Sequence, residues 1–224
     1  MTTVVFAAHP DDETLGAGAT IARLAKTQDV HVVIMGEGIT ARIGHRDDRE
    51  AVRALCDDAA TAASVLGVAS ITSLGLPDLR FATLPLLEIV WKVEEVIDRL
   101  RPDVVYTHSA GDLNQDHELT ARAVLTATRP MAGCPVRDIY SFEVPSSTEW
   151  SFGRRCPEFR PNVFVDVENS IEVKIQAMEC YRSERRDFPH PRSAEALRAI
   201  ARRWGSVVGH PYAEAFELVR SVRS

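Results

Sequence analysis

The chain begins with an uninterrupted apolar run, residues 3–8, which ends in a histidine, a proline and three acids. An apolar run rich in Val, without polar alternation, is typical of a strand that is buried on both faces of a parallel sheet. A stretch of helical character follows at once, from about residue 14 to 26. A buried strand followed directly by a helix is the start of a βαβ unit, so this feature already favours a parallel sheet covered by helices.

The same alternation continues along the rest of the chain. The predicted strands are 3–8, 30–35, 70–74, 104–107, 139–142 and 163–167, and the predicted helices are 14–26, 51–66, 84–100, 116–128, 170–181, 193–204 and 213–222. Right-handed crossovers join such units. We therefore predict an α/β, Rossmann-like three-layer fold with a mainly parallel sheet. The length suits a single domain, residues 1–224, on which the C-terminal helices from about residue 170 also pack.

Helical spacing also predicts part of the core. Within the segment 84–100, four apolar residues share one face: Leu87, Val90, Val93 and Ile97. Side chains three and four residues apart lie on the same side of a helix, so we expect this face to be buried. Trp91 and Trp204, which also fall on predicted helices, are expected in the core.

Composition excludes several classes of protein. With 26 Lys and Arg against 32 Asp and Glu, the formal charge is −6, which argues against broad nucleic-acid binding. No apolar run reaches the roughly 18 residues that span a bilayer. The N-terminus has no basic leader, so we expect no membrane span and a cytoplasmic location. Four cysteines without a CxxC pair do not match a structural zinc site, and reduced thiols are expected. The oligomeric state is left open, with a homo-oligomer among the alternatives.

The loop after the first strand has residues spaced for chemistry. His9 and Asp12 stand three residues apart at a strand-to-helix turn, where an imidazole and a carboxylate can bind one metal ion together. Asp11 lies between them and must point elsewhere. The structural alternative is that Asp11, Asp12 and Glu13 merely begin a helix, because acids in the first turn complement the helix dipole.

The loop after the fourth predicted strand adds a second set. In the common Rossmann-like order, strands one and four are neighbours, and ligands bind in the crevice at their carboxyl ends. This crevice joins the first loop to Asp112, Asp116 and His117. Two histidines and one carboxylate, with open positions left over, are typical of a catalytic zinc site, and the same set also serves non-haem iron. We expect the metal site at the C-terminal ends of strands one and four.

Two stretches carry a family resemblance: AAHPDDETLGAGATIARLA at the first strand and VVYTHSAGDLNQDHELTARAV at the fourth. They resemble the LmbE-like (PIG-L) superfamily of zinc-dependent de-N-acetylases, which hydrolyse acetamides on amino sugars or their conjugates. The resemblance implies that His9, Asp12 and His117 bind one Zn²⁺ per chain. It also implies that Asp11 is the general base, and that the products are acetate and a free amine.

One position departs from the family pattern. Many members have a histidine three residues before the last zinc ligand, where it supports the oxyanion, and this chain has Asn114. An asparagine can donate a hydrogen bond but cannot carry a positive charge. The catalytic donor is therefore Asn114 itself or another residue, with His108 and His190 as candidates. Asp116 is expected to orient a ligand or an arginine, and the alternative is that it caps a helix.

Five side chains are expected to face the substrate: Arg42, Asp112, Trp150, His190 and Arg192. Arg42 follows the second strand, at the same edge of the sheet as the metal loops. His190 and Arg192 lie on a loop stiffened by two prolines, and Ser193 in that loop is expected to cap the next helix. Trp150 lies in a polar loop that could wall a sugar pocket. The alternatives are ordinary surface charge and ordinary surface loops.

These observations lead to one main hypothesis of function and two alternatives. The main hypothesis is a zinc hydrolase whose partner is a small-molecule N-acetylated substrate, an amino sugar or a glycosylated metabolite. The first alternative keeps the metal site but places a non-sugar amide in it. The second is a sugar- or nucleotide-binding module without turnover. The absence of a GxGxxG turn after the first strand and the acids in its place argue against the binding module.

Overall fold

The centre of the protein is one seven-stranded sheet, seen here in a computed structural model that describes residues 1–154 and 158–223. Its strands are β1 (Thr2–Ala7), β2 (Asp29–Gly36), β3 (Ser70–Leu76), β4 (Val104–His108), β5 (Asp138–Phe142), β6 (Val163–Asp166) and β7 (Ala213–Ser221). The order across the sheet is β3-β2-β1-β4-β5-β7-β6. The strands from β3 to β5 are parallel, whereas β7 runs antiparallel to both β5 and β6. The predicted mainly parallel sheet is confirmed.

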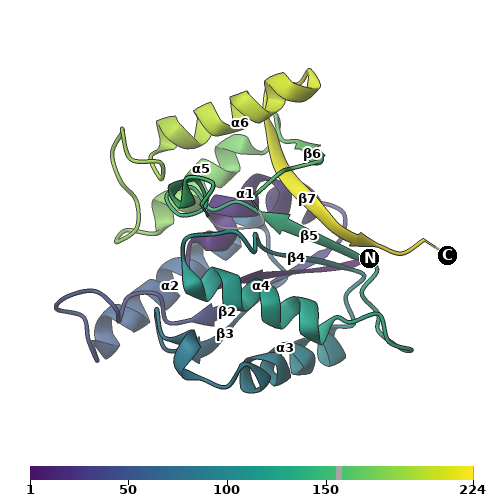
Figure 1. Cartoon of the computed structure of the whole chain (residues 1–224). Helices are drawn as coiled ribbons and strands as arrows, with labels where there is room; N and C mark the ends of the chain where they lie inside the picture. The colour runs from purple at the N-terminus through teal and green to yellow at the C-terminus, as the bar shows by residue number, and fades with distance from the viewer. Residues whose placement is uncertain (155–157, 224) are drawn as a thin grey trace.

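Helices cover both faces of the sheet (Figure 1). They are α1 (Asp12–Leu24), α2 (Arg49–Leu66), α3 (Leu86–Leu100), α4 (Gln115–Ala127), α5 (Ile171–Cys180) and α6 (Ala194–Val208). One core lies between the sheet and α1, α2, α5 and α6, and the other lies between the sheet and α3 and α4. Alternate β1 side chains divide between them, with Val5 in the first core and Val4 and Phe6 in the second, as the period of two in a strand requires.

Strand β1 lies between β2 and β4, as the sequence predicts. The parallel register pairs Val5 with Tyr106 of β4, so both strands end at the same edge of the sheet. The two loops that follow them are tied together directly, because the Ala8 amide donates a hydrogen bond to His108 Nε2 at 2.8 Å. The polar residues of both loops therefore meet at the carboxyl ends of neighbouring strands, where α/β sheets bind ligands.

The C-terminal segment differs from the sequence prediction. The pattern predicts a helix over 213–222, but the structure forms β7 there. The predicted final strand, 163–167, corresponds to β6, which pairs with β7 at the edge of the sheet. Ala, Glu and Leu favour a helix locally, yet β5 and β6 provide hydrogen-bonding partners on both sides of this segment. Tertiary pairing overrides the local preference, because strand formation depends on neighbours that are distant in the sequence.

Two residues predicted in the core lie at the surface. Leu87 is 54% exposed and Trp91 is 53% exposed. The buried stripe of α3 consists of Ile89, Val90, Val93, Val96 and Ile97, so its centre is offset from the predicted face. Trp204 is half-buried, and its indole N–H donates a hydrogen bond to Glu143.

The state of the cysteine thiols and the apolar length of the helices can be compared with the expectations of reduced thiols and of no membrane span. Cys56, Cys134 and Cys180 have free thiols, and Cys156 lies outside the described residues. Burial raises the pKa of the Cys56 and Cys180 thiols, which keeps them protonated at neutral pH. Across residues 1–154 and 158–223, no helix combines the length and the apolar character needed to cross a bilayer.

A glycine in α1 lets this helix approach the sheet closely. A Cβ atom at Gly16 would lie 2.2 Å from a ring carbon of Phe142, which is fully buried at the end of β5. At Gly18 the closest neighbour of such an atom is Lys174 Cγ, at the longer distance of 3.1 Å. The contact at Gly16 therefore holds α1, which carries Asp12 in its first turn, against the sheet.

We predict that Gly16→Ala destabilises the protein by about 1–3 kcal/mol, because overpacking forces the Phe142 ring or the helix to move. This loss should exceed the roughly 1 kcal/mol that Ala contributes to helix propensity over Gly. The free energy of unfolding, measured by urea denaturation, tests this. Gly18→Ala is the matched control and should cost less stability than Gly16→Ala, because its closest contact is 3.1 Å rather than 2.2 Å. Equal stability of the two variants would contradict the packing argument.

Candidate metal centre

The turn between β1 and α1 is shaped by its own acids. Asp11 adopts a left-handed backbone conformation with φ of 106°, which is strained for a residue with a side chain. Its amide donates to the Glu13 carboxylate at 3.1 Å, and the His9 amide donates to Asp12 Oδ2 at 2.9 Å. The Asp11 side chain makes no capping bond to the helix. The turn therefore fixes two neighbouring carboxylates in different directions, which the spacing of these residues predicts.

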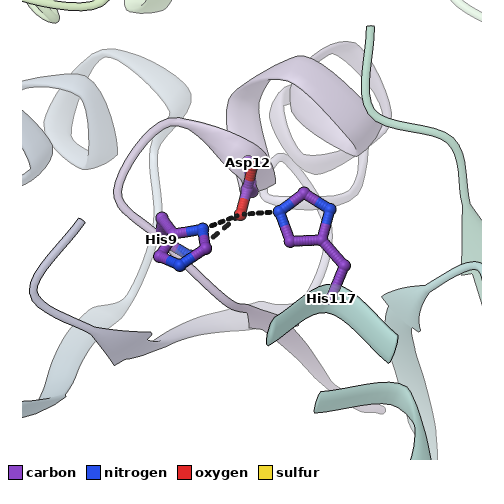
Figure 2. Close-up of side chains that lie close together, drawn as sticks. All are labelled: His9, Asp12 and His117. Carbon is purple, nitrogen blue, oxygen red and sulfur yellow. Dashed lines mark hydrogen bonds and ion pairs between the residues drawn. The ribbon is translucent and has the colours of Figure 1, made fainter. Parts of the chain in front are cut away.

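Three buried side chains from the two loops converge on one point: His9, Asp12 and His117. Asp12 Oδ2 lies 3.4 Å from His9 Nδ1 and 3.1 Å from His117 Nε2. Figure 2 shows the carboxylate between the two imidazole rings, with His117 reaching it from α4. One ligand atom from each residue lies within 4.8 Å of the others. This group could hold a metal ion, and the structure brings together the three residues that the family resemblance implies.

Two further carboxylates lie beside the second nitrogen of the His9 ring. His9 Nε2 lies 3.1 Å from Asp116 Oδ2 and 3.4 Å from Asp78 Oδ1. Asp116 is itself fixed by the Phe81 amide, which donates to its Oδ1 at 3.1 Å. Asp116 therefore orients a histidine, whereas the helix cap is Asn114, whose side chain accepts the Asp116 amide at 2.9 Å.

Asp112 does not face a substrate, contrary to the sequence prediction. It is fully buried, and its Oδ1 lies 3.2 Å from His117 Nδ1. The hydroxyls of Ser147 and Thr148 also donate to its carboxylate. Burial raises its pKa, but the charge and contact of His117 and these hydroxyls outweigh burial and lower it to about 2. Asp112 is thus a permanent negative charge behind His117, a common arrangement around ligating histidines.

The electrostatics of this group suit a cation. Burial alone lowers the pKa of His9, but the carboxylates of Asp116, Asp12 and Asp78 outweigh it and raise the pKa to about 10. Burial also lowers the pKa of His117, but the carboxylates of Asp12 and Asp112 outweigh it and raise the pKa to about 9. The surrounding negative charge therefore holds protons on both rings, and a divalent cation bound to the neutral rings would replace them. The donor set, two imidazoles and a carboxylate, fits a zinc-type ion.

His108 has a structural position rather than a catalytic one. Its side chain is fully buried, and its ring stacks on that of His117 with the centroids 4.0 Å apart. Its Nε2 accepts the Ala8 amide, so this nitrogen carries no proton to donate. Burial and the neighbouring His117 lower its pKa to about 3. The pocket that contains Asp11 is not lined by His108, so this arrangement does not support it as an oxyanion donor.

Asp11 meets a chain of charges from the last loop. Arg192 Nη1 donates to Asp11 Oδ2 at 2.6 Å and to Glu184 Oε2 at 3.0 Å. Arg42 Nη2 donates to the same Glu184 oxygen at 2.5 Å, and Arg192 Nε donates to Ser146 at 2.8 Å. Burial raises the pKa of Asp11 well above its usual range, while the charge of Arg192 opposes this rise. Arg192, which is predicted to face the substrate, thus contacts Asp11 directly. Arg42, predicted to do the same, is joined to Arg192 through the buried carboxylate of Glu184.

The open part of the site is a pocket of about 220 Å³ between the loops. His9, Asp11, Asp12 and His117 line it on one side, and Asn114, Arg42, Arg192, Ser146 and Glu184 are among the residues of its other walls. Asn114 Oδ1 accepts the hydrogen bond of the helix cap, and Asn114 is also one of the residues that line the pocket. Trp150 and His190 contact each other, with ring centroids 5.8 Å apart, and neither lines this pocket. Ser193 caps α6 as predicted, since it accepts the Ala196 amide.

Three buried acids of the site are not assigned to it from the sequence: Asp78, Glu184 and Glu13. Asp78 follows β3, so its place at the carboxyl end of a neighbouring strand is a signal that could have found it. Glu184 stands in the loop between α5 and α6, where no spacing relates it to the metal loops. In the sequence Glu13 appears only as part of a helix start, yet it is buried and accepts hydrogen bonds from Thr14 and Tyr181.

Comparison with known families decides the assignment. Residues 4–128 match the PIG-L family, described as GlcNAc-PI de-N-acetylase. The match spans more than half of the chain and includes both metal loops. The chain belongs to this family. The resemblance drawn from the two sequence stretches is confirmed, and the mainly parallel α/β fold agrees with it.

Individual relatives carry names of more than one activity. The deacetylase YaiS of Escherichia coli, described as uncharacterized, is 32% identical over 187 residues, which cover 80% of this chain and 90% of YaiS. The diacetylchitobiose deacetylase of Thermococcus kodakarensis is 27% identical, with 96% and 81% covered. The structure of GalB, the 4-carboxy-2-hydroxymuconate hydratase of Pseudomonas putida KT2440, matches with a TM-score of 0.78 at 24% identity, with 100% and 98% covered. The fold thus occurs with different activities, and function must be argued from the site.

We predict that Asp116→Asn weakens Zn²⁺ binding by about 10- to 100-fold, because the negative charge that orients His9 is lost while the shape is kept. Competition with a chromophoric chelator measures this affinity. Asp138→Asn, which removes a buried carboxylate at the start of β5, is the matched control and should bind Zn²⁺ as the unaltered protein does. Unchanged affinity of Asp116→Asn would show that Asp116 does not support the metal centre.

Proposed function

We propose that this protein is a zinc-dependent N-deacetylase that removes an acetyl group from an N-acetylated amino sugar or a glycosylated metabolite. The observation that carries the proposal is the position of Asp11. Its buried carboxylate lines the same pocket as His9, Asp12 and His117, and Arg192 holds one of its oxygens. A proton acceptor beside a group of metal-binding side chains is the arrangement that metal-assisted hydrolysis requires.

The proposed ligands of Zn²⁺ are His9, Asp12 and His117, with Asp116 and Asp112 orienting the two histidines from behind. The donor set and its negative surroundings fit this ion. A bound Zn²⁺ lowers the pKa of a coordinated water toward neutrality and polarises a carbonyl oxygen. Membership of a family described as a de-N-acetylase, and the deacetylases among the relatives, support an acetamide as the substrate.

Asp11 is placed to move the protons. Its Oδ2 accepts the hydrogen bond of Arg192, which leaves Oδ1 to take a proton from the attacking water. Burial raises the pKa of the Asp11 carboxyl, so the group can hold this proton and then give it to the leaving amine. Hydroxide adds to the acetyl carbon, the C–N bond breaks and the amine gains the proton, so that one water and one acetamide give acetate and a free amine.

Asn114 is the proposed donor to the developing oxyanion. It lines the pocket beside His117, and the helix cap fixes its side chain through Oδ1, while its Nδ2 group forms no hydrogen bond with the residues that the structure describes. A fixed neutral donor stabilises negative charge that appears only in the transition state. His190 makes a ring contact with Trp150 outside the pocket, which favours Asn114 over it for this role.

Two alternatives are tested by the same assay. A non-sugar amide in the same site would release acetate from simple acetamides as readily as from N-acetylated sugars. A binding module without turnover would release none. Because one neighbour in fold is named as a hydratase, acetate release is measured rather than loss of substrate. A screen of N-acetylated sugars, sugar nucleotides and glycosides therefore identifies both the reaction and the substrate class.

We predict that Asp11→Asn lowers the rate of acetate release by about 100- to 10,000-fold, because the proton acceptor is lost. Elemental analysis should still find about one Zn²⁺ per chain, since Asp11 is not a proposed ligand. Removal of metal by a chelator should abolish activity, and added Zn²⁺ should restore it. Asp57→Asn, an exposed acid on α2, is the matched control. Normal activity of Asp11→Asn would contradict the proposal. So would a protein that purifies without metal and still releases acetate.

We predict a smaller effect for the oxyanion donor. Asn114→Ala should lower kcat by about 10- to 1000-fold with a lesser change in KM, since the interaction is strongest in the transition state. Asn114→Asp separates the roles of the residue, because it keeps the helix cap but removes the Nδ2 donor. Steady-state kinetics on the best substrate of the screen test this. A near-normal kcat in Asn114→Asp would move the oxyanion role to another residue.

A further inference from the structure

A second hollow adjoins the metal-centre pocket. It measures about 500 Å³ and lies between the loop after β2 and the loop after β3. Four residues line both spaces: Ala41, Arg42, Asp78 and Leu79. The two spaces therefore share a boundary, so the hollow is the immediate neighbour of a ligand whose acetamide lies at the metal centre. A volume of this size is typical of small-molecule sites.

The hollow is basic, in contrast to the pocket beside it. Arg42, Arg46 and Arg80 line it, and Asp78 is its single acid. Asp78 is already engaged, because its Oδ2 accepts the Ala41 amide at 3.0 Å and its Oδ1 lies against His9. The metal-centre pocket, by comparison, is lined by the carboxylates of Asp11, Asp12, Asp78 and Glu184. The hollow thus has an excess of positive charge, whereas in the metal-centre pocket four carboxylates outnumber Arg42 and Arg192.

Two of these arginines are not engaged by other side chains in the part of the chain that the structure describes. Arg46 and Arg80 are exposed, and their guanidinium groups form no hydrogen bond or ion pair with the residues that the structure describes. Arg42 is different, since its Nη2 is held by Glu184. Exposed arginines are usually just solvated. Here they differ from that case because they come from two separate loops and line one hollow that adjoins the metal-centre pocket.

We infer that this hollow is a subsite for an anionic group of the substrate, a phosphate or a carboxylate attached to the acetamide-bearing molecule. The inference rests on the proposed function and narrows its substrate class. Arginine guanidinium groups bind planar or tetrahedral oxyanions through paired hydrogen bonds. Arg46 and Arg80 bind the anion directly, and Arg42 joins this subsite to the metal centre through Glu184. Neutral N-acetylated sugars are then the poorer substrates.

Paired variants test the subsite by kinetics. The double variant Arg46→Gln/Arg80→Gln should lower kcat/KM for N-acetylglucosamine 1-phosphate by about 10- to 100-fold, the effect of losing charged hydrogen bonds. The kcat/KM for N-acetylglucosamine should change less than about twofold, since this sugar has no anionic group to bind. The matched control is Arg53→Gln/Arg122→Gln, which removes two exposed arginines that do not line the hollow. N-acetylmuramic acid, compared with N-acetylglucosamine, shows whether a carboxylate serves in place of a phosphate.

A binding measurement keeps the subsite separable from the reaction. Calorimetry with the Asp11→Asn variant should show tighter binding of N-acetylglucosamine 1-phosphate than of N-acetylglucosamine, and the Arg46→Gln/Arg80→Gln change should remove the difference. If such binding is found but the unaltered protein releases no acetate, the subsite stands and the proposed deacetylation fails.

Three results overturn the subsite: equal binding of the phosphorylated and neutral sugars, equal loss in both double variants, and phosphate binding that persists in Arg46→Gln/Arg80→Gln. The last result would show that groups other than Arg46 and Arg80 bind the phosphate.

Discussion

The site depends on one buried carboxylate. Asp12 is almost fully shielded from water, and it lies between two imidazoles that reach it from different loops. A buried negative charge is costly unless positive charge or hydrogen bonds surround it. The His9 amide and the rings of His9 and His117 supply that compensation. The same demand for positive charge is what makes the position suitable for a metal ion, so stability of the fold and affinity for a cation have a common origin.

Around this centre, carboxylates are arranged in two roles. Asp116 and Asp112 lie behind the histidines and fix the directions of their rings. Asp11 faces the pocket instead, because its left-handed backbone turns it away from Asp12. Residues adjacent in sequence thus take different positions, and the proposed function gives one the task of holding a cation and the other that of moving protons. The strain of this backbone conformation is of the kind that persists where the surroundings enforce it, and here Glu13 binds the strained amide.

The loop between α5 and α6 carries Glu184 and Arg192, and both residues line the metal-centre pocket. Arg192 bonds to both Asp11 and Glu184, and Arg42 bonds to Glu184 from the other side. Arg42, which also lines the neighbouring hollow, is therefore linked to Asp11 through three charged contacts. Four carboxylates line the metal-centre pocket, and the hollow beside it is lined by three arginines and one acid. Under the proposed function, this separation would let a substrate place its acetamide and an anionic group in surroundings of opposite sign.

The sequence by itself determined the parallel sheet and the two metal loops. The unbroken apolar run before His9 is typical of a buried strand, and the common Rossmann-like strand order places the fourth strand beside it. Local spacing could not determine β7, because helix-favouring residues there pair with strands distant in the sequence. It also could not place Asp78 or Glu184, nor reveal that Asp112 and His108 face inward. Those roles depend on which side chains are buried together, and only the tertiary structure decides that.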